Sequence, residues 1–498
     1  MEQESPAYAL LAARHLPCAL HLLFDSDKSS RALPIWNLEE CAEPAASAIF
    51  VCGIGLGEAF THFTPWLEKS ALHRLIFIES RADHLRFFME SVLAEIILAH
   101  PQVVLHFFDG SPLKQLIGDT FRPEIFVMVH PERPDLAPLA EAILEEQLLF
   151  SGEMGTLLFP IQLIESAIEN YAQMSSRGFL LSKLEGRFSG VAAVVCGAGP
   201  SLEDEKALLA KLEKKALIMA GGSAIAALHK AGITPHLATA IDPTEEEVSR
   251  CTALKEIDIP LLFIPSLYHE VVKMHQGRLG LIRTAGPLPF ESAIEELFGL
   301  NQPSLGEKLT RKALSVTTLQ VALAHFFGCS PIYLVGVDLS YQNGARYASG
   351  VNGAALISDE NNPFLEGVNA LGERVSTQLH WKIESEALSA YASAYPETRF
   401  YNCSSKGLAI DHFPHARLDE LLACEPRELR ALLEVHTTPH LHFLSKDKLA
   451  QALQKIPIET LVSVKELHPD LGEHEQDICS KLREMVKLKI ELLLKRSI

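Results

Sequence analysis

Short apolar runs that alternate with helix-length segments constrain the fold of this 498-residue chain more than any other feature. Such runs begin near positions 48, 75, 103 and 125, and again near 191, 216, 237, 261 and 331. Successive parallel strands need a crossover connection, which is usually a helix. The pattern therefore predicts an α/β protein with two Rossmann-like parallel-sheet domains, followed by a C-terminal helical region.

Two interruptions of this alternation give the predicted domain boundaries. Residues 1–155 are predicted to form the N-terminal Rossmann-like domain, and residues 156–187, which have a helical period, a connector. Residues 188–418 carry the second α/β pattern. No strand-like run follows, and residues 419–498 are predicted to form amphipathic helices that pack or assemble a homo-oligomer.

Charge and composition exclude several classes of protein. The chain has 44 Lys and Arg against 63 Asp and Glu, a net charge of −19, whereas nucleic-acid binding needs a basic face. No apolar run approaches the ~20 residues of a membrane-spanning helix, and the acidic first residues differ from a signal peptide. Nine cysteines without a Cys-x-x-Cys pair indicate free thiols in a reducing compartment. We therefore expect a cytoplasmic protein with no nucleic-acid or membrane partner.

A glycine-rich turn follows the first apolar run of the second block. It contains Gly197, Gly199, Pro200 and Ser201 and leads into a helix-forming segment. Glycine lets a backbone approach a ligand closely, Ser201 is suited to cap the helix, and free N–H groups at a helix start bind phosphate. Pro200 and the missing lysine exclude a Walker A loop. Spacing alone leaves a phosphate-binding loop and a purely structural turn as equal alternatives.

Polar residues follow other apolar runs of the same block. Ser223 comes after the second run, Asp242 after the third, and Gly336 and Asp338 after the run at 331–335. Ligands of open α/β sheets bind at the carboxyl ends of the strands, and a buried carboxylate needs hydrogen-bonding partners. We expect these residues to contact a ligand. The alternative for the two aspartates is that they cap neighbouring helices.

These motifs resemble the central domain of the motility-associated-factor (Maf-type) glycosyltransferases over residues 160–415. They are similar, more distantly, to bacterial sialyltransferases that use CMP-sialic acid, and to the 6-hydroxymethylpterin diphosphokinase-like domain. Maf-type enzymes place nonulosonic sugars on Ser or Thr of flagellin. The resemblance therefore implies a glycosyltransferase that takes such a sugar from a CMP-activated donor and transfers it to an acceptor protein such as flagellin.

The resemblance also implies roles for individual residues. Tyr341 and Tyr347 match the tyrosines that hydrogen-bond the departing phosphate in the sialyltransferases, and His380 falls where those enzymes keep a catalytic histidine. The glycine-rich turn would hold the cytidine phosphate, and Ser223 and Asp242 would contact the nucleoside. An imidazole with a pKa near 6.5 suits a general base at neutral pH. Since phenols can assist the departing phosphate, neither a metal ion nor a cofactor is expected.

Two alternatives stay open. The resemblance to the pterin domain implies a pyrophosphokinase that needs ATP and Mg²⁺, for which Asp242 and Asp338 are the candidate carboxylates. The other alternative is a nucleotide-binding scaffold without catalysis. Ala198 departs from the asparagine that the sialyltransferases have at this position, and this substitution bears on the identity of the donor.

The N-terminal block contains a second glycine-rich turn, with Gly53, Gly55 and Gly57. Glu79 ends the next apolar run, as the acidic residue that binds ribose hydroxyls does in dinucleotide and S-adenosylmethionine sites. The favoured alternative is a turn retained for structural reasons.

Overall fold

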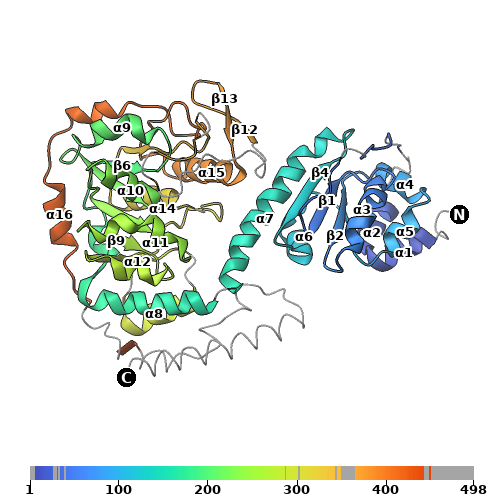
Figure 1. Ribbon diagram of the computed structural model, residues 1–498, viewed down its shortest axis with the longest axis horizontal. Coiled ribbons are helices and arrows are strands. Elements are labelled where there is room, and N and C mark those ends of the chain that lie inside the picture. The colour runs from blue at the N-terminus through green and yellow to red at the C-terminus, as the bar shows by residue number, and fades with distance from the viewer. Residues whose placement is uncertain are drawn as a thin grey trace. The chain divides into compact units, whose positions relative to one another are not determined.

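The computed structural model divides into two compact units, residues 1–154 (unit 1) and 155–498 (unit 2), and each contains its own parallel sheet (Figure 1). This confirms the predicted fold class. The residues that the structure describes are 6–25, 31, 34–38, 41–158, 160–285, 288–300, 303–313, 315–342, 345–348, 351, 365–441 and 448–449.

Unit 1 has a four-stranded parallel sheet in the order β3-β2-β1-β4. Its strands are β1 (Ala48–Cys52), β2 (Arg74–Glu79), β3 (Val103–Phe107) and β4 (Ile125–Val129). Its helices are α1 (Pro6–Arg14), α2 (Leu16–Phe24), α3 (Glu58–Glu68), α4 (Ala82–Met89), α5 (Ala94–Ala99), α6 (Leu113–Thr120) and α7 (Ala137–Leu158), which crosses into unit 2. A 3₁₀ turn, Pro134–Leu136, precedes α7.

Both faces of this sheet are covered by helices, as Figure 1 shows for α3 and α5 on one side and α6 and α7 on the other. Side chains of a strand point alternately to opposite faces. Ile49 and Val51 accordingly pack into one apolar core, while Phe50 and Cys52 pack into the other. A strand buried on both faces reads as a continuous apolar run, which is why the sequence pattern predicts β1 well.

Unit 2 has an eight-stranded parallel sheet in the order β14-β11-β6-β7-β8-β9-β10-β5. Its strands are β5 (Gly178–Leu180), β6 (Ala192–Cys196), β7 (Ala216–Gly221), β8 (Leu237–Ala240), β9 (Leu261–Phe263), β10 (Leu279–Leu281), β11 (Ile332–Val335) and β14 (Phe400–Asn402). The predicted strands do not include β5, β10 and β14, which have three residues each.

Helices cover the sheet of unit 2, and a small antiparallel hairpin, β12 (Leu365–Val368) and β13 (Arg374–Thr377), lies beside α15 (Figure 1). The helices are α8 (Pro160–Arg177), α9 (Leu202–Leu209), α10 (Ser223–Lys230), α11 (Glu246–Arg250), α12 (His269–Met274), α13 (Pro289–Phe298), α14 (Val316–Phe326), α15 (Leu379–Ala394) and α16 (Leu429–His436). Three 3₁₀ segments complete the described elements: Leu181–Leu184, Thr252–Lys255 and Leu418–Ala423.

The segment predicted as a connector, residues 156–187, is largely built into unit 2. Its helix α8 ends at Arg177, and the chain then adds β5 to the edge of the sheet. The Nδ2 atom of Asn170 on α8 donates to the carbonyls of Pro265 and Leu267, at 2.9 and 2.7 Å. These contacts attach α8 to the segment before α12.

The described part of the predicted C-terminal region, residues 419–441 and 448–449, also belongs to unit 2. Leu429 and Leu433 of α16 pack into the same apolar core as β6 and β11. The predicted amphipathic helices and their homo-oligomer depend largely on residues 442–447 and 450–498. These residues lie outside the described part of the chain.

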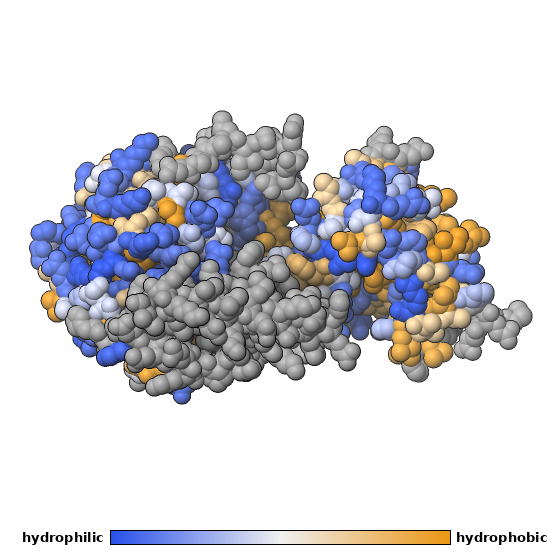
Figure 2. All heavy atoms as spheres, turned by 60° about the horizontal axis from the view of Figure 1, so that its bottom comes forward, coloured by the Kyte–Doolittle hydropathy of each residue, from blue (hydrophilic) through white to orange (hydrophobic). Residues whose placement is uncertain are grey.

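The described helices include none that is both long enough and apolar enough to cross a membrane. The described cysteines are free thiols, and Cys52 and Cys196 are buried. Apolar residues do reach the surface of unit 1, where Figure 2 shows patches of them among polar side chains. On α2, Leu16 and Leu20 are exposed by 55% and 42% and line a groove of about 840 Å³.

Candidate functional site

The sheet of unit 2 has a topological switch point between β6 and β11. From β6 the chain adds β7, β8, β9 and β10 on one side, whereas β11 and β14 lie on the other. In open α/β sheets a crevice forms at such a point, outside the carboxyl ends of the two strands. The turn at 197–201 follows β6, and the segment 336–342 follows β11, so the structure places both at this crevice.

The glycines of these two segments make a close backbone contact. The N–H of Gly199 donates to the carbonyl of Gly336 at 2.7 Å. A methyl group on Gly199 would lie 2.4 Å from Oδ2 of Asp338, and one on Gly197 would lie 2.4 Å from the Gly336 carbonyl oxygen. The spacing left a ligand-binding loop and a structural turn as equal alternatives, and the resemblance implied the first. The structure shows that they are needed for the approach of two protein segments.

Asp338 holds the glycine-rich turn in place. It is 2% exposed. Its Oδ2 accepts a hydrogen bond of 2.8 Å from the backbone N–H of Ser201, and its Oδ1 accepts one from the hydroxyl of Ser404. Since Ser201 lies at the start of α9, this contact matches the helix-capping alternative for Asp338. Sequence reasoning gave Ser404 no role, because its partner is 66 residues away.

Ser201 occupies the N-cap position of α9, but its side chain does not cap the helix. Its φ of −64° and ψ of −13° are helical, whereas a side-chain cap needs an extended residue. The predicted cap is therefore wrong. The Oγ atom is buried and has no hydrogen-bond partner among the described residues. Pro200 precedes it, and the Pro200 carbonyl accepts from the N–H of Glu203 at 3.1 Å.

A cavity of about 340 Å³ opens beside this turn, within the size range of small-molecule sites. It is formed by residues that follow β6, β11 and β14. Three basic side chains line it, those of Lys406, His415 and Arg417, together with Ser201 and Ser404. It also has acidic walls, which the sequence pattern did not indicate: Asp204, Glu205 and Asp419.

Two further predicted residues lie at neighbouring strand ends. Ser223 is the half-buried first residue of α10, directly after β7. Asp242 follows β8, and its carboxylate accepts from the N–H of Thr244 at 2.9 Å and pairs with Arg250 at 2.7 Å. Asp242 therefore stabilises its own loop but does not cap a helix, since the N-cap of α11 is Glu245. No hydrogen bond in the described part of the chain joins either residue to the turn at 197–201.

The structure brings the three predicted catalytic residues into one cluster. The rings of Tyr341 and Trp381 lie 4.9 Å apart, and those of His380 and Trp381 lie 5.2 Å apart. The guanidinium carbon of Arg346 lies 5.0 Å from the ring centre of Tyr347 and 5.5 Å from that of Trp381. Arg346 and Trp381 thus connect the predicted residues, although sequence reasoning gave neither of them a role.

A strained residue leads into this cluster. Leu339 has a φ of +49°, a backbone conformation that residues other than glycine seldom adopt. Such conformations are frequent at functional sites. The hydroxyl of Thr377 donates to the Leu339 carbonyl at 2.7 Å, and the N–H of Tyr341 donates to the carbonyl of Ser376 at 2.9 Å. The Gln378 amide also donates to the Tyr341 hydroxyl. Residues at and after β13 therefore fix the phenol of Tyr341.

The environment of His380 lowers its pKa to about 4. Burial is the larger cause, and the positive charge of Arg346 is the second. We expected the ordinary imidazole value near 6.5. The structure differs because both causes disfavour the imidazolium form, so His380 is neutral at pH 7.

A buried carboxylate lies one helical turn beyond His380. Glu384 is on the same face of α15 at i+4 and is 8% exposed. The hydroxyl of Ser315, which caps α14, donates to it. Burial raises the pKa of Glu384 to about 7. Its spacing from His380 was visible in the sequence, but its partner Ser315 was not.

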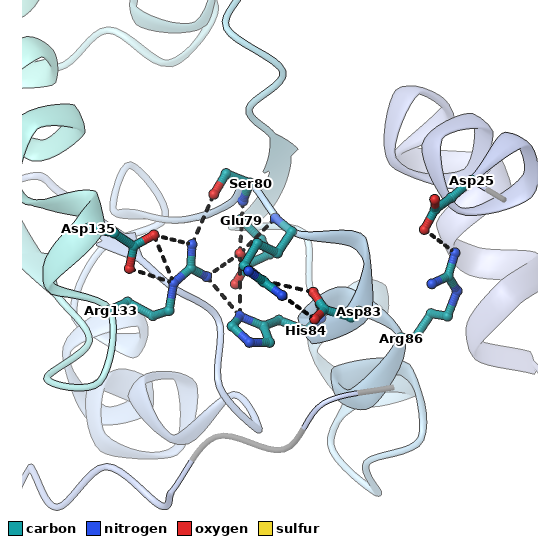
Figure 3. A network of polar contacts seen from close by, with 9 residues as sticks. Asp25, Glu79, Ser80, Asp83, His84, Arg86, Arg133 and Asp135 are labelled. Carbon is teal, nitrogen blue, oxygen red and sulfur yellow. Dashed lines mark hydrogen bonds and ion pairs between the residues drawn. The ribbon is translucent and has the colours of Figure 1, made fainter. Parts of the chain in front are cut away.

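In unit 1 the predicted cofactor residue has a structural role (Figure 3). Glu79 is fully buried and accepts hydrogen bonds from Arg133 and from the backbone N–H groups of Ser80 and Arg81. Arg133 also donates to the Ser80 hydroxyl at 2.9 Å. The carboxylate is therefore occupied by protein groups and is closed off from a ribose.

Protein atoms also occupy the space beside each glycine of the turn in unit 1. A methyl group on Gly53 would lie 2.9 Å from Cβ of His130, and one on Gly57 would lie 2.3 Å from Cδ1 of Ile97. One on Gly55 would lie 2.6 Å from a carboxylate oxygen of Glu58. These contacts support the alternative of a structural turn.

Comparisons with known proteins agree with parts of the sequence interpretation. Residues 165–344 match the family model described as 6-hydroxymethylpterin diphosphokinase MptE-like, as the predicted resemblance requires. No curated protein matches the chain. One similar solved structure is a Maf glycosyltransferase from Magnetospirillum magneticum AMB-1, with 14% identity, 98% of this chain and 94% of that chain covered, and a TM-score of 0.46.

Another is the sialyltransferase CstII from Campylobacter jejuni, solved in complex with a substrate analogue, cytidine-5'-monophosphate. It has 14% identity, 46% of this chain and 86% of that chain are covered, and the TM-score is 0.22. Both proteins come from the glycosyltransferase classes that the sequence motifs resemble.

Proposed function

We propose that unit 2 is a glycosyltransferase that moves a nonulosonic, sialic-acid-like sugar from a CMP-activated donor to a Ser or Thr hydroxyl of an acceptor protein such as flagellin. The grouping of Tyr341, Tyr347 and His380 carries this proposal, because the motif resemblance assigns the chemistry to these three residues. The reaction is proposed to take place in the cytoplasm, without a metal ion or cofactor.

The donor nucleotide is proposed to bind at the turn 197–201. The unpartnered hydroxyl of Ser201 and the adjoining cavity of about 340 Å³ support this position. Gly197, Gly199, Gly336 and Asp338 contribute indirectly, since they fix the backbone that meets the ligand. Ser223 and Asp242, at the ends of β7 and β8, would contact the nucleoside.

In the transfer step, the acceptor hydroxyl oxygen bonds to the anomeric carbon of the sugar as the bond from that carbon to the CMP phosphate oxygen breaks. His380 takes the proton of the hydroxyl through the free lone pair of its neutral ring, although a pKa of about 4 makes it a weaker base than an imidazole with the ordinary value of 6.5. The phenols of Tyr341 and Tyr347 donate hydrogen bonds to the departing phosphate, where negative charge develops. CMP leaves as the second product.

The match of residues 165–344 favours a second candidate, a pyrophosphokinase that acts on a pterin. This reaction needs carboxylates that hold Mg²⁺ against ATP. The two candidates, Asp242 and Asp338, already bond to Arg250 and to Ser201 and Ser404. Their engagement within the protein supports the glycosyltransferase over the kinase.

Thermal unfolding of the full chain with CMP, CDP, or ATP plus Mg²⁺ tests the proposal. A ligand that binds only the native state adds ~2.7 kcal/mol of stability at a hundredfold excess over its Kd. We expect a stabilising shift with CMP that Tyr347→Ala reduces. A shift with ATP and Mg²⁺ alone would favour the kinase over the glycosyltransferase, and no shift with any nucleotide would contradict both candidates.

A further inference from the structure

Arg346 presents a positive charge inside the aromatic cluster. Its guanidinium carbon lies over the rings of Tyr347 and Trp381, at 5.0 and 5.5 Å from their centres. Both distances are within the range of cation–π contacts, so the two rings fix the plane of the guanidinium group. Its charge reaches His380, since it contributes to the lowered pKa of that imidazole.

Within the described part of the chain, one donor of this guanidinium group has no partner. Its Nε atom is buried and has no hydrogen-bond partner among the described residues. A buried donor without a partner costs free energy, which a ligand acceptor would recover. Nearby, the side chains of Gln378 and Tyr341 satisfy each other, because the Gln378 amide donates a hydrogen bond to the Tyr341 hydroxyl.

The backbone next to Arg346 is attached to the glycine-rich turn. The N–H of Ala348, two residues further on, donates to the carbonyl of Ala198 at 2.8 Å. The segment that carries the arginine is therefore held between the turn at 197–201 and the N-terminus of α15, where His380 lies. An anion bound at this point lies close to the base.

We infer that Arg346 binds an oxyanion of the sugar donor, either its phosphate or the carboxylate of its sugar, and so selects donors that are negatively charged at the reacting end. The planar fork of an arginine matches both groups, because each offers two oxygens to parallel N–H donors. This inference rests on the proposed function for the identity of the donor, but the anion site itself does not depend on it.

Calorimetric titration of the full chain tests the inference with four probes: cytidine, CMP, CMP-N-acetylneuraminate and inorganic pyrophosphate. The variants are Arg346→Gln, which keeps polar bulk without charge, and Arg346→Lys, which keeps charge without the fork. Arg374→Gln is the matched control, since that arginine is 82% exposed on β13. Unfolding temperatures establish that each variant is folded.

We expect Arg346→Gln to weaken oxyanion binding roughly 10- to 100-fold, Arg346→Lys to weaken it less, and Arg374→Gln to leave it unchanged. Cytidine binding stays the same in all four proteins. A loss for both CMP and the CMP-sugar assigns the phosphate. A loss for the CMP-sugar alone, down to the affinity of CMP, assigns the sugar carboxylate.

Equal affinity of wild type and Arg346→Gln for every anion would overturn the inference. If Arg346→Gln does not fold, unchanged anion affinity of Arg346→Lys would overturn it as well. Wild-type chain that binds no cytidine nucleotide would refute the proposed function instead. In that case the titration with pyrophosphate is the remaining test. Weaker pyrophosphate binding by Arg346→Gln than by wild type supports an anion site at Arg346, and equal binding, or no binding by wild type, rejects it.

Discussion

The carboxylate of Asp338 accepts a 2.8 Å hydrogen bond from the backbone N–H of Ser201, which lies 137 residues earlier in the chain. Its other oxygen accepts from the hydroxyl of Ser404. A single side chain thus joins the segments that follow β6, β11 and β14. The shape of the crevice depends on this carboxylate, and its removal gives a direct test.

Replacement of Asp338 by asparagine is expected to lower the free energy of unfolding by about 1–3 kcal/mol, because an amide nitrogen cannot accept one of the two hydrogen bonds. CMP affinity should fall with it, since the turn loses its anchor. Denaturant unfolding and CMP titration measure both effects. Asp411→Asn, at an exposed turn residue, is the control and should change neither. Unaltered CMP binding by Asp338→Asn would show that the turn is held by other contacts.

Gly199→Ala is expected to abolish nucleotide binding. The added methyl group would lie 2.4 Å from Oδ2 of Asp338 and 2.8 Å from the Gly336 carbonyl, so the turn must move. Gly152→Ala is the matched control, because nothing lies within 4 Å of that position in α7. There alanine should raise helix stability by up to ~1 kcal/mol. A Gly199→Ala protein that binds CMP as wild type does would disprove the importance of this close contact.

The pH dependence of kcat/KM reports the free enzyme and therefore His380 without donor. With a pKa of about 4, the imidazole stays neutral from pH 8 down to about 5, so kcat/KM should lose its base only below that. Arg346→Gln removes a positive charge and should move this limb to higher pH. An acidic limb near pH 6.5 in wild type would show that His380 is not the base or is not buried.

The same shift has a consequence for stability. The folded-state pKa of His380 lies below its ordinary value of 6.5, so protons bind preferentially to the unfolded chain. Its contribution to stability is complete above pH 6.5 and is lost as the pH falls toward 4. His380→Gln should make the free energy of unfolding less dependent on pH between pH 4 and 6.5.

Glu384 should produce the opposite pH dependence. Its pKa is raised from 4.5 to about 7 by burial, so the folded chain binds the proton more tightly than the unfolded chain. The contribution of Glu384 to the free energy of unfolding is complete below pH 4.5 and declines as the pH rises through 7. Glu384→Gln should remove this decline, whereas Glu386→Gln, at a half-exposed ion pair on the same helix, should not. Unfolding profiles between pH 4 and 9 compare the two variants.

The ion pair of Glu79 and Arg133 should be essential for the stability of unit 1. Arg133→Met leaves a buried carboxylate without its cation, which typically costs about 3–5 kcal/mol. Hydrogen exchange of β1 and β2 should accelerate, while that of β6 and β11 stays constant. Arg81→Gln, which removes a more exposed partner of Asp83, is the control. Equal exchange in both variants would show that the pair is dispensable.

The sequence predicted the central strands because they are buried on both faces. A strand such as β6 has five apolar or small residues in a row, all buried, and such a run is typical of the middle of a parallel sheet. The two edge strands, β5 and β14, were not predicted. β5 and β14 have three residues each, and the only signal for them is a partner strand that is distant in sequence.

Which residues belong to the site was partly visible, but their contacts were not. The motif resemblance named Tyr341, Tyr347 and His380, and the structure groups them. It could not show that Trp381 and Arg346 connect them, or that burial and this arginine depress the pKa of His380. Neighbours in space set pKa values and hydrogen bonds, and a single sequence records only neighbours along the chain.

The glycine-rich turn of unit 1 shows the same limit. Gly53, Gly55, Gly57 and Glu79 have the spacing of a cofactor site. Arg133, 54 residues beyond Glu79, decides against it, because it occupies the carboxylate that a ribose would need.

The anchoring of Ser201 through Asp338 and Ser404 also sets the time at which the site forms during synthesis. A ribosome adds about 5–20 residues per second, so the 203 residues that follow Ser201 up to and including Ser404 take roughly 10–40 s to make. Until Asp338 is made the turn lacks its anchor, and until Ser404 is made the Asp338 carboxylate lacks its second partner. The nascent chain therefore completes this part of the crevice only after most of unit 2 has been translated.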